Sequence, residues 1–324
     1  MIDLTMTNTA VTVIRCEDYE NKKVSDALIR QFEFLGGLDK FVSHGDSVLL
    51  KPNFIAAKSR RCATQTDPAV ILETAKLIKD FGAKPFIGDS PAWGDISNNI
   101  KKLKLDGPLQ KLGVPVKQLN KPKKCHIGSD GTVVGLSSVA MEADTIINLP
   151  KFKSHQQLVA TFAVKNMFGC VSGKKKAYWH FAKGDSEAEF CRLLIGIYEY
   201  LSPSLTIIDG ITAMDGPGPI NGRARPLGYL VAGSDPIACE TICGKLINLK
   251  PEDLPIVRTA RQIGFGCSDI EKITILGDNF EDNICADFEP ARLIPIKFSL
   301  YHVCRSIGKQ VLLLAKSLIN KKSN

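Results

Sequence analysis

Short runs of apolar, mostly β-branched residues alternate along the chain with segments whose apolar residues recur every three or four positions. The short runs predict strands and the periodic segments predict amphipathic helices. The strand runs are apolar throughout, which is typical of a sheet buried on both faces. The predicted strands are 10–14, 47–51, 84–88, 144–148, 205–209, 227–231 and 272–276, and the predicted helices are 24–35, 66–82, 158–168, 238–247 and 256–263.

This alternation predicts an α/β fold, with a largely parallel sheet and helices on both faces. No internal repeat or low-complexity linker divides residues 1–293, so we expect them to form a single α/β domain. The stretch of about 105–135 is richer in Pro, Gly and Lys and contains the turn sequence Ser129-Asp130-Gly131. It predicts a small antiparallel insertion.

The last segment, 294–324, has a different pattern. Its apolar residues recur at three- and four-residue steps from Ile296 to Leu318, with basic residues between them. This predicts a C-terminal amphipathic helix. Two uses of its apolar face stay open: docking on the domain or on a second subunit of a homo-oligomer, or lying on an anionic membrane surface as a peripheral contact.

Composition narrows the class of protein. The net charge of +8 favours anionic partners. The lysine runs at 101–104, 121–124, 174–176 and 321–322 are interpreted as solvated faces, and they lack the interleaved aromatic residues typical of nucleic-acid binding. The ten cysteines form no CxxC motif and no iron–sulfur motif. The sequence also has no secretory signal and no long apolar run. We therefore expect the cysteines to be buried thiols in a cytoplasmic protein.

Polar residues follow the ends of several predicted strands. In open parallel sheets ligands bind beyond the carboxyl ends of the strands. The expected binding residues there are Lys51 and Asn53 after the second strand, Asp89 after the third and Lys151 after the fourth, with Asp209 after the fifth as a catalytic candidate. Lysine recurs in these positions more than packing alone requires, which predicts a site for an anionic small molecule.

The densest group of candidate residues runs from Asn148 to His180. If the segment is extended, Lys151, Lys153 and His155 lie on the same side. Neighbouring ammonium groups would keep the imidazole neutral near pH 7, as a general base requires. Lys165 is a catalytic candidate and Asn166 a binding candidate, because burying them in an apolar helix without partners is costly. His180 is interpreted as either a binding residue or half-buried packing.

A second group follows Asp209. Asp215, Gly216 and Gly218 belong to a rigid turn rich in Gly and Pro, whose spacing does not match a nucleotide-binding loop. The carboxylates of Asp209 and Asp215 could bind a divalent metal, orient a lysine or accept a proton. Asp235 precedes a proline that opens a helix, so it is a helix cap first and a binding candidate second.

These residues also carry a resemblance. The segments 48–53, 66–68, 88–90, 147–155, 164–169, 208–210, 215–219 and 234–236 stand in the order seen in the domain of unknown function 362 family. The resemblance covers about 45–280. It implies no particular reaction, because the family has none agreed, and some members carry an added ferredoxin-type module that this chain lacks. Asp215 stands where members often have Glu, and Glu240 where they often have Asp.

Three functions are compatible with these features. The first is an enzyme that acts on an anionic small molecule by Lys/His acid–base chemistry at the strand ends. The second is a redox or metallocofactor protein without its own ferredoxin module. The third is a non-catalytic binding protein associated with a membrane through the C-terminal helix. The sequence identifies neither the substrate nor a cofactor.

Overall fold

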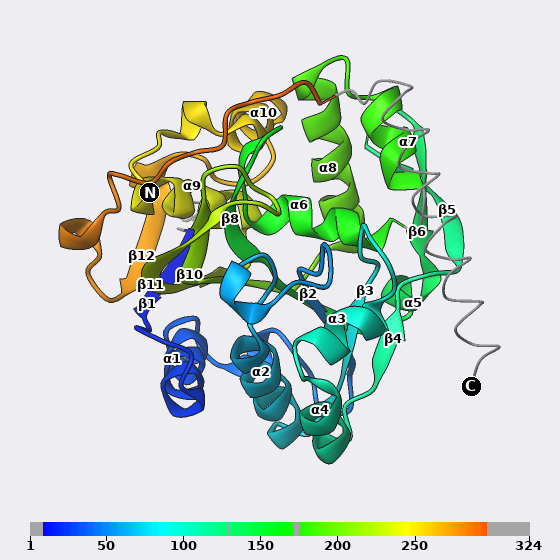
Figure 1. The fold of residues 1–324 in the computed structure, drawn as a ribbon, viewed down its shortest axis with the longest axis vertical. Helices are drawn as coiled ribbons and strands as arrows, with labels where there is room; N and C mark the ends of the chain where they lie inside the picture. Colours follow the sequence, from blue (N-terminus) through cyan, green and yellow to red (C-terminus); the bar gives the residue numbers. More distant parts are fainter. Residues whose placement is uncertain (1–8, 129, 172–174, 297–324) are drawn as a thin grey trace, which may run out of the picture.

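The computed structural model describes residues 9–128, 130–171 and 175–296. Its centre is a ten-stranded mixed sheet (Figure 1). The strands of this sheet are β1 (Thr9–Arg15), β2 (Ser47–Pro52), β3 (Lys84–Asp89), β4 (Val116–Gln118), β7 (Thr145–Leu149), β8 (Lys151–His155), β9 (Val159–Thr161), β10 (Leu205–Asp215), β11 (Arg223–Gly233) and β12 (Ile273–Gly277). A separate antiparallel hairpin consists of β5 (Pro122–Ile127) and β6 (Thr132–Ser137).

The strand order of the sheet is β12-β1-β11-β10-β7-β2-β3-β4. Strands β10, β7, β2, β3 and β4 run parallel, and β11 is antiparallel to both of its neighbours. Strand β8 continues the line of β7 along β10, in parallel register, and β9 folds back on it. The carboxyl ends of β2, β3 and β7 therefore meet at one edge of the sheet, as parallel pairing requires. The predicted α/β class and largely parallel sheet are confirmed.

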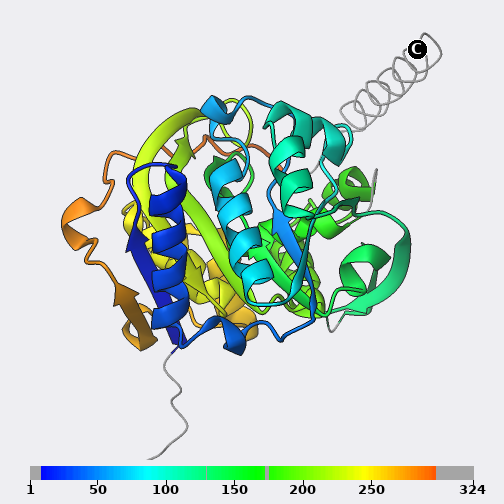
Figure 2. The same cartoon turned by 90° about the horizontal axis from the view of Figure 1, so that it is seen from below.

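Helices cover both faces of the sheet. One layer, which faces the viewer in Figure 2, contains α1 (Asn21–Phe34), α2 (Pro68–Asp80), α3 (Ile96–Lys102) and α4 (Asp106–Leu112). The opposite layer contains α6 (Ala163–Met167), α8 (Glu187–Leu201), α9 (Pro236–Leu246) and α10 (Pro255–Ile263). Two further helices are α5 (Ser138–Met141) and α7 (Lys175–Ala182). Each layer buries its own apolar cluster against the sheet.

The predicted helix over 158–168 is wrong in its first half. Residues 159–161 form β9, which pairs with β8 through Lys153 and Thr161. The α-helix is limited to the five residues of α6, and Phe168 begins a short 3₁₀ helix. A short apolar run has no periodicity that distinguishes a helix from a buried strand. Here tertiary pairing with β8 decides in favour of the strand. The sequence also did not predict the 15-residue helix α8.

The predicted insertion is displaced toward the C-terminus. Residues 106–118 continue the main fold, because α4 leads into β4, which pairs with β3. The antiparallel part is the hairpin β5–β6, with its turn near the predicted position. The predicted C-terminal helix lies outside the described residues from 297 onward. Among the helices that the structure describes, none has the length and apolar character needed to span a membrane.

Candidate functional site

A cavity of about 90 Å³ lies at the edge where β2, β3 and β8 meet α6 and α7. We call it the lysine cavity. The polar side chains that line it are Lys51, Asn53, Asp89, Ser90, Lys153, His155, Thr161, Lys165, Asn166 and Lys176. Seven of these ten were predicted as site residues from the sequence. An apolar cavity of about 150 Å³ is known to bind benzene, so this smaller space fits a compact group rather than a nucleotide.

Lys51 is the fixed cation of the lysine cavity. It is 1% exposed, and its Nζ lies 2.8 Å from Asp89 Oδ1 while also donating to the Pro52 carbonyl and to Asn166 Oδ1. Asp89 accepts from the backbone N–H of Phe54 and of Ser90 as well. A Cβ at Gly169 would lie 2.6 Å from both Lys51 Nζ and Asp89 Oδ1, so only glycine leaves room for this pair. Every N–H of the ammonium is used within the protein.

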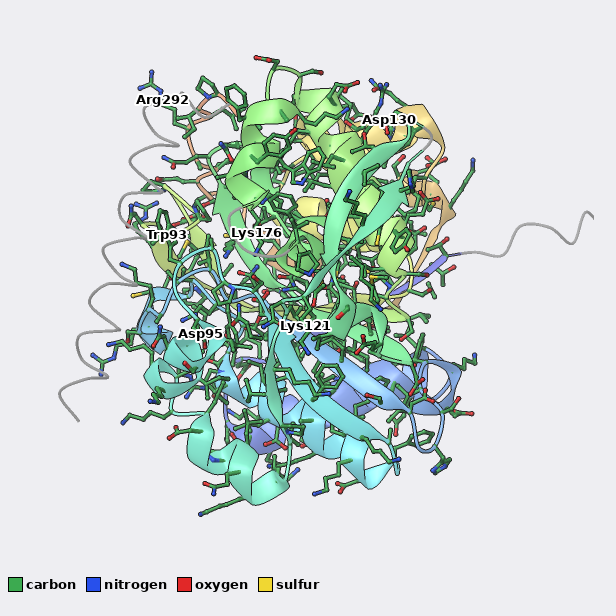
Figure 3. All side chains as sticks on the ribbon, turned by 90° about the vertical axis from the view of Figure 1, so that its right-hand side faces the viewer. Trp93, Asp95, Lys121, Asp130, Lys176 and Arg292 are labelled. Atoms are coloured by element: carbon green, nitrogen blue, oxygen red, sulfur yellow. The ribbon has the colours of Figure 1, made fainter. Side chains whose placement is uncertain are left out.

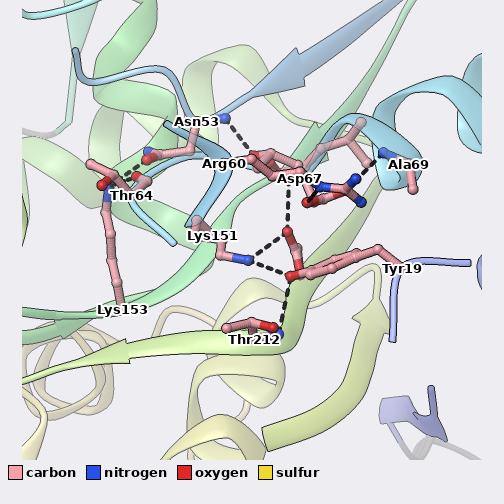
Figure 4. Close-up of polar contacts among 12 residues, drawn as sticks. Tyr19, Asn53, Arg60, Thr64, Asp67, Ala69, Lys151, Lys153 and Thr212 are labelled. Carbon is pink, nitrogen blue, oxygen red and sulfur yellow. Dashed lines mark hydrogen bonds and ion pairs between the residues drawn. The ribbon is translucent and has the colours of Figure 1, made fainter. Parts of the chain in front are cut away.

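Lys153 is held differently. Its Nζ donates to Asn53 Oδ1 and, at 2.9 Å, to the Thr64 carbonyl (Figure 4). Both acceptors are neutral, and among the described residues no carboxylate forms an ion pair with this lysine. Burial first, and then the charges of Lys165, Lys151 and Lys51, lower the pKa of Lys153 to about 7. Such a lysine is neutral or charged at nearly equal cost near neutral pH.

A chain of three amides backs Lys153. Asn53 Nδ2 donates to Asn166 Oδ1 at 2.8 Å, and Asn166 Nδ2 donates to Asn148 Oδ1 at 2.7 Å. Asn148 in turn donates to the Ala163 carbonyl and to Thr206 Oγ1. The NH₂ group of each amide donates to a group farther from the cavity, so its oxygen accepts a hydrogen bond from a group nearer the cavity. This fixes the Asn53 oxygen toward Lys153.

Lys165 and Lys176 complete the basic lining. Lys165, on α6, has its Nζ 4.8 Å from the centre of the Phe168 ring. Lys176, on α7, donates to the Ser90 carbonyl and is labelled on the face seen in Figure 3. Burial lowers the pKa of each lysine to about 8. Lys176 contributes to the shift of Lys165, and Lys51 contributes to that of Lys176.

The two histidines are neutral. Burial and the charge of Lys165 hold the pKa of His155 well below its usual range. His155 Nδ1 accepts from the backbone N–H of Gln157 at 3.1 Å, so the ring proton lies on Nε2. His180 lies behind Phe168, with its ring 4.6 Å from that of Phe190, and burial followed by Lys165 lowers its pKa to about 3. His155 lines the lysine cavity, whereas His180 packs against the aromatic side chains next to it.

Lys151 lines a second cavity, of about 230 Å³, and Asp209 is its buried ion-pair partner. Lys151 Nζ is 2.7 Å from both Asp209 Oδ2 and the Tyr19 hydroxyl, which donates to Asp209 Oδ1 at 2.8 Å (Figure 4). Asp209 also accepts from the backbone N–H of Asp67 at 2.9 Å. These groups satisfy one another. Thus Lys151 diverges from Lys153 and His155, because the register along β10 shifts between the positions that pair with Lys151 and Lys153.

The segment 63–66 separates the two cavities. Ala63, Gln65 and Thr66 line the second cavity, while the Thr64 carbonyl accepts from Lys153. The predicted meeting of Asp209 with Lys51, Lys153 and Lys165 at one pocket therefore does not occur. Asp209 lies at the same edge of the sheet, but across this segment.

The remaining predicted residues lie outside the lysine cavity. Asp215 forms an ion pair with Arg223 at 3.2 Å, and the Gly216 carbonyl accepts from the Ser154 hydroxyl. A Cβ at Gly218 would lie 2.0 Å from the Ser154 carbonyl, so the turn packs closely on β8. Asp235 caps α9 by accepting from the N–H of residues 237 and 238. Its helix-cap interpretation is the one the contacts support.

Sequence reasoning missed Lys176, Tyr19, Arg60 and Asp67. Lys176 was interpreted as part of a solvated run, yet it lines the lysine cavity. Its proximity to the glycines at 169 and 173 was the available signal. Arg60 binds Asp67 in two places, at 2.5 and 2.7 Å, and its guanidinium lies 5.2 Å from the centre of the Tyr19 ring. Nothing in the local pattern around Arg60 distinguishes it from an exposed loop residue.

The charges of the lysine cavity define what it can bind. Four lysine side chains and one carboxylate, Asp89, are among the described lining residues. Lys51 is compensated by that carboxylate, and the other three are not. An anion would therefore be attracted. In the described parts of the chain no group of three His, Cys, Asp or Glu side chains is positioned to hold a metal ion. The predicted divalent metal stays a prediction.

Comparisons with known proteins agree with the resemblance in the sequence. Residues 48–245 match the model of a family described as a domain of unknown function, DUF362. The chain is 36% identical over 305 residues to a thylakoid-associated protein of Synechocystis sp., covering 93% of this chain and 94% of that protein. The solved lactate racemase apoprotein of Thermoanaerobacterium thermosaccharolyticum matches with a TM-score of 0.47 and 13% identity, over 75% of this chain and 58%, less than two thirds, of that chain. The chain belongs to the DUF362 family.

Proposed function

We propose that this protein is an enzyme that binds a compact anionic small molecule in the lysine cavity and transfers a proton to or from it. The observation that carries the proposal is the environment of Lys153. This lysine is 2% exposed and donates to two neutral oxygens, without a carboxylate partner among the described residues.

The geometry of an amine explains why this environment suits proton transfer. A neutral lysine amine has two N–H groups and one lone pair, and an ammonium has three N–H groups. Asn53 and Thr64 accept two N–H groups in either state. Only the remaining position changes between lone pair and N–H, and Lys153 lines the lysine cavity. With a pKa of about 7, Lys153 can serve as base or acid near neutral pH.

The other lining residues supply binding and polarisation. Lys165 and Lys176 would compensate the negative charge of the ligand, and Lys51 would add a fixed positive charge. His155, with its proton on Nε2, would donate a hydrogen bond to a ligand oxygen rather than accept a proton. In this proposal Lys153 replaces the imidazole as the base expected from the sequence.

Solution NMR tests the proposal. The wild-type chain, Lys153→Met and the exposed control Lys102→Met are titrated with pyruvate, lactate and phosphate, and deuterium incorporation from D₂O into the two organic acids is followed. We expect wild type and the control to bind at least one anion and to accelerate exchange at carbon, and Lys153→Met to lose the exchange. Absence of anion binding, or unchanged exchange in Lys153→Met, would overturn the proposal.

We also propose peripheral association with a membrane surface. The related protein of Synechocystis sp. is described as thylakoid-associated, and the sequence of 294–324 predicts a basic amphipathic helix. The redox alternative predicts colour or bound metal in anaerobically purified protein, which metal analysis and an absorption spectrum would detect.

A further inference from the structure

The four lysines of the lysine cavity differ in how many partners hold each ammonium group. Lys51 donates to three oxygens, Lys153 to two and Lys176 to the Ser90 carbonyl. For Lys165 Nζ the described residues provide no hydrogen bond and no ion pair, only the face of the Phe168 ring. Lys165 is thus the lysine whose nitrogen is least engaged.

A lysine acts as a nucleophile only when its nitrogen is neutral and its lone pair is accessible. The Phe168 ring gives Lys165 an apolar contact on one side, and the cavity that it lines provides access for a ligand. Burial, followed by the charge of Lys176, lowers its pKa to about 8, so a substantial fraction is neutral at physiological pH.

We propose that Lys165 is a nucleophile that forms an imine with the carbonyl carbon of a compact 2-oxo acid. This inference rests on the proposed function, because it takes the anion in the lysine cavity to be the carboxylate of that acid. Lys176, which donates to the Ser90 carbonyl and forms no ion pair among the described residues, is the cationic group available for the carboxylate. The ligand class is narrowed to molecules in which a carbonyl adjoins the negative charge.

The step needs no oxidant or reductant. The Lys165 nitrogen attacks the carbonyl carbon, a C–N bond forms, and the oxygen takes up a proton to give a carbinolamine. The nitrogen loses a proton, the hydroxyl leaves as water after protonation, and a C=N bond remains. Lys153 in its charged form is the lining group that could deliver a proton to the departing oxygen, to which the His155 Nε2–H could donate a hydrogen bond. The C=N bond then withdraws electrons from the carbon next to the imine carbon (C3 of the 2-oxo acid), which would ease removal of a C3 proton by Lys153.

Reductive trapping tests the inference. The full chain is incubated with pyruvate, reduced with sodium borohydride, and examined by intact mass and peptide mapping. Lactate, which has no keto group, serves as the ligand control. Lys165→Arg keeps the charge but cannot form the imine, and Lys183→Arg is a matched control outside the cavity. We expect pyruvate to label the peptide that contains Lys165 in wild type and Lys183→Arg, with complete loss of label in Lys165→Arg.

The outcomes separate the two proposals. Circular dichroism and retained binding of lactate or phosphate would show that Lys165→Arg is folded. Pyruvate binding without any trapped adduct would overturn the imine and leave the proposed proton transfer standing. An adduct at Lys153 or Lys176 instead of Lys165 would overturn the assignment of the nucleophile. Failure of every anion to bind would overturn both proposals.

Discussion

The lysines at the site show how local partners divide one residue type into different roles. Lys51 forms an ion pair with Asp89, whereas Lys153 has only neutral acceptors. The sequence indicated that lysines gather at the strand ends, because their recurrence there exceeds what packing requires. It could not separate their roles, since these depend on acceptors that are distant in the chain, such as the Thr64 carbonyl.

The low pKa of Lys153 predicts how stability depends on pH. Between its folded pKa of about 7 and its ordinary value of 10.5, the unfolded chain binds one more proton here than the folded chain, so the free energy of unfolding rises with pH. Relative to Lys153→Met, the free energy of unfolding of wild type should increase by up to about 1.4 kcal/mol per pH unit in this window, and it should not change with pH below the window. Urea unfolding at several pH values measures this. Parallel curves for the two proteins would contradict it, and Lys102→Met should follow wild type.

Gly169 predicts a packing effect at the Lys51–Asp89 pair. In Gly169→Ala the added Cβ would overlap both charged atoms, and we expect a loss of about 1–3 kcal/mol in the free energy of unfolding. Gly107 is the matched control, because its Cβ would meet nothing within 4 Å. Gly107→Ala, in α4, should be neutral or stabilising by no more than about 1 kcal/mol. Equal melting temperatures for the two variants would exclude the proposed overlap.

At the scale of elements, the short helix α6 depends on a side chain from another helix. Glu240 of α9 is 2% exposed and accepts from the backbone N–H of Val164 at 2.9 Å, at the start of α6. A five-residue helix is too short to be stable alone. The Glu240 carboxyl group therefore positions the helix that carries Lys165 and Asn166. In the sequence, Glu240 was noted only through the family resemblance. Because a longer helix was predicted over 158–168, the dependence of the short helix α6 on Glu240 was not foreseen.

Glu240 predicts a pH dependence opposite to that of Lys153. Burial raises its pKa from 4.5 to about 8, so between these values the folded chain holds a proton that the unfolded chain has lost. The free energy of unfolding therefore falls as pH rises through this range. Glu240→Gln keeps an acceptor oxygen but does not titrate. As the pH rises from about 5 to 8, its free energy of unfolding should therefore increase relative to that of wild type by up to about 1.4 kcal/mol per pH unit. Denaturant unfolding of both proteins at about pH 5 and at about pH 8 measures this change. A constant difference would refute the raised pKa.

At the scale of the whole molecule, the sheet explains why the site could be predicted in part. Parallel pairing brings the ends of β2, β3 and β7 to one edge, so strand-end residues such as Lys51 and Asp89 meet by topology alone. Residues supplied by α7 and by the loop before α2, such as Lys176 and Arg60, have no periodic signal. The division into two cavities depends on the path of residues 63–66, and no pattern in the sequence predicts this path.

The predicted membrane association concerns the chain as a whole. We expect the full chain to co-sediment with vesicles containing anionic lipid, and less so with neutral vesicles, because a basic amphipathic helix binds through both apolar area and charge. The matched variant ends at residue 296, which keeps the contacts of Gln157 with the Pro295 and Ile296 carbonyls. Equal partitioning of the two chains would exclude a membrane role for residues 297–324.

The amide chain behind Lys153 has a consequence for the direction of proton traffic. Asn53, Asn166 and Asn148 can orient hydrogen bonds, but near neutral pH an amide neither releases nor takes up a proton. The interior of the protein thus insulates Lys153 from behind. Lys153 can therefore exchange protons only through the lysine cavity, so it would transfer a proton to or from only one face of a bound molecule. A reaction at a carbon centre there would be stereospecific with respect to Lys153.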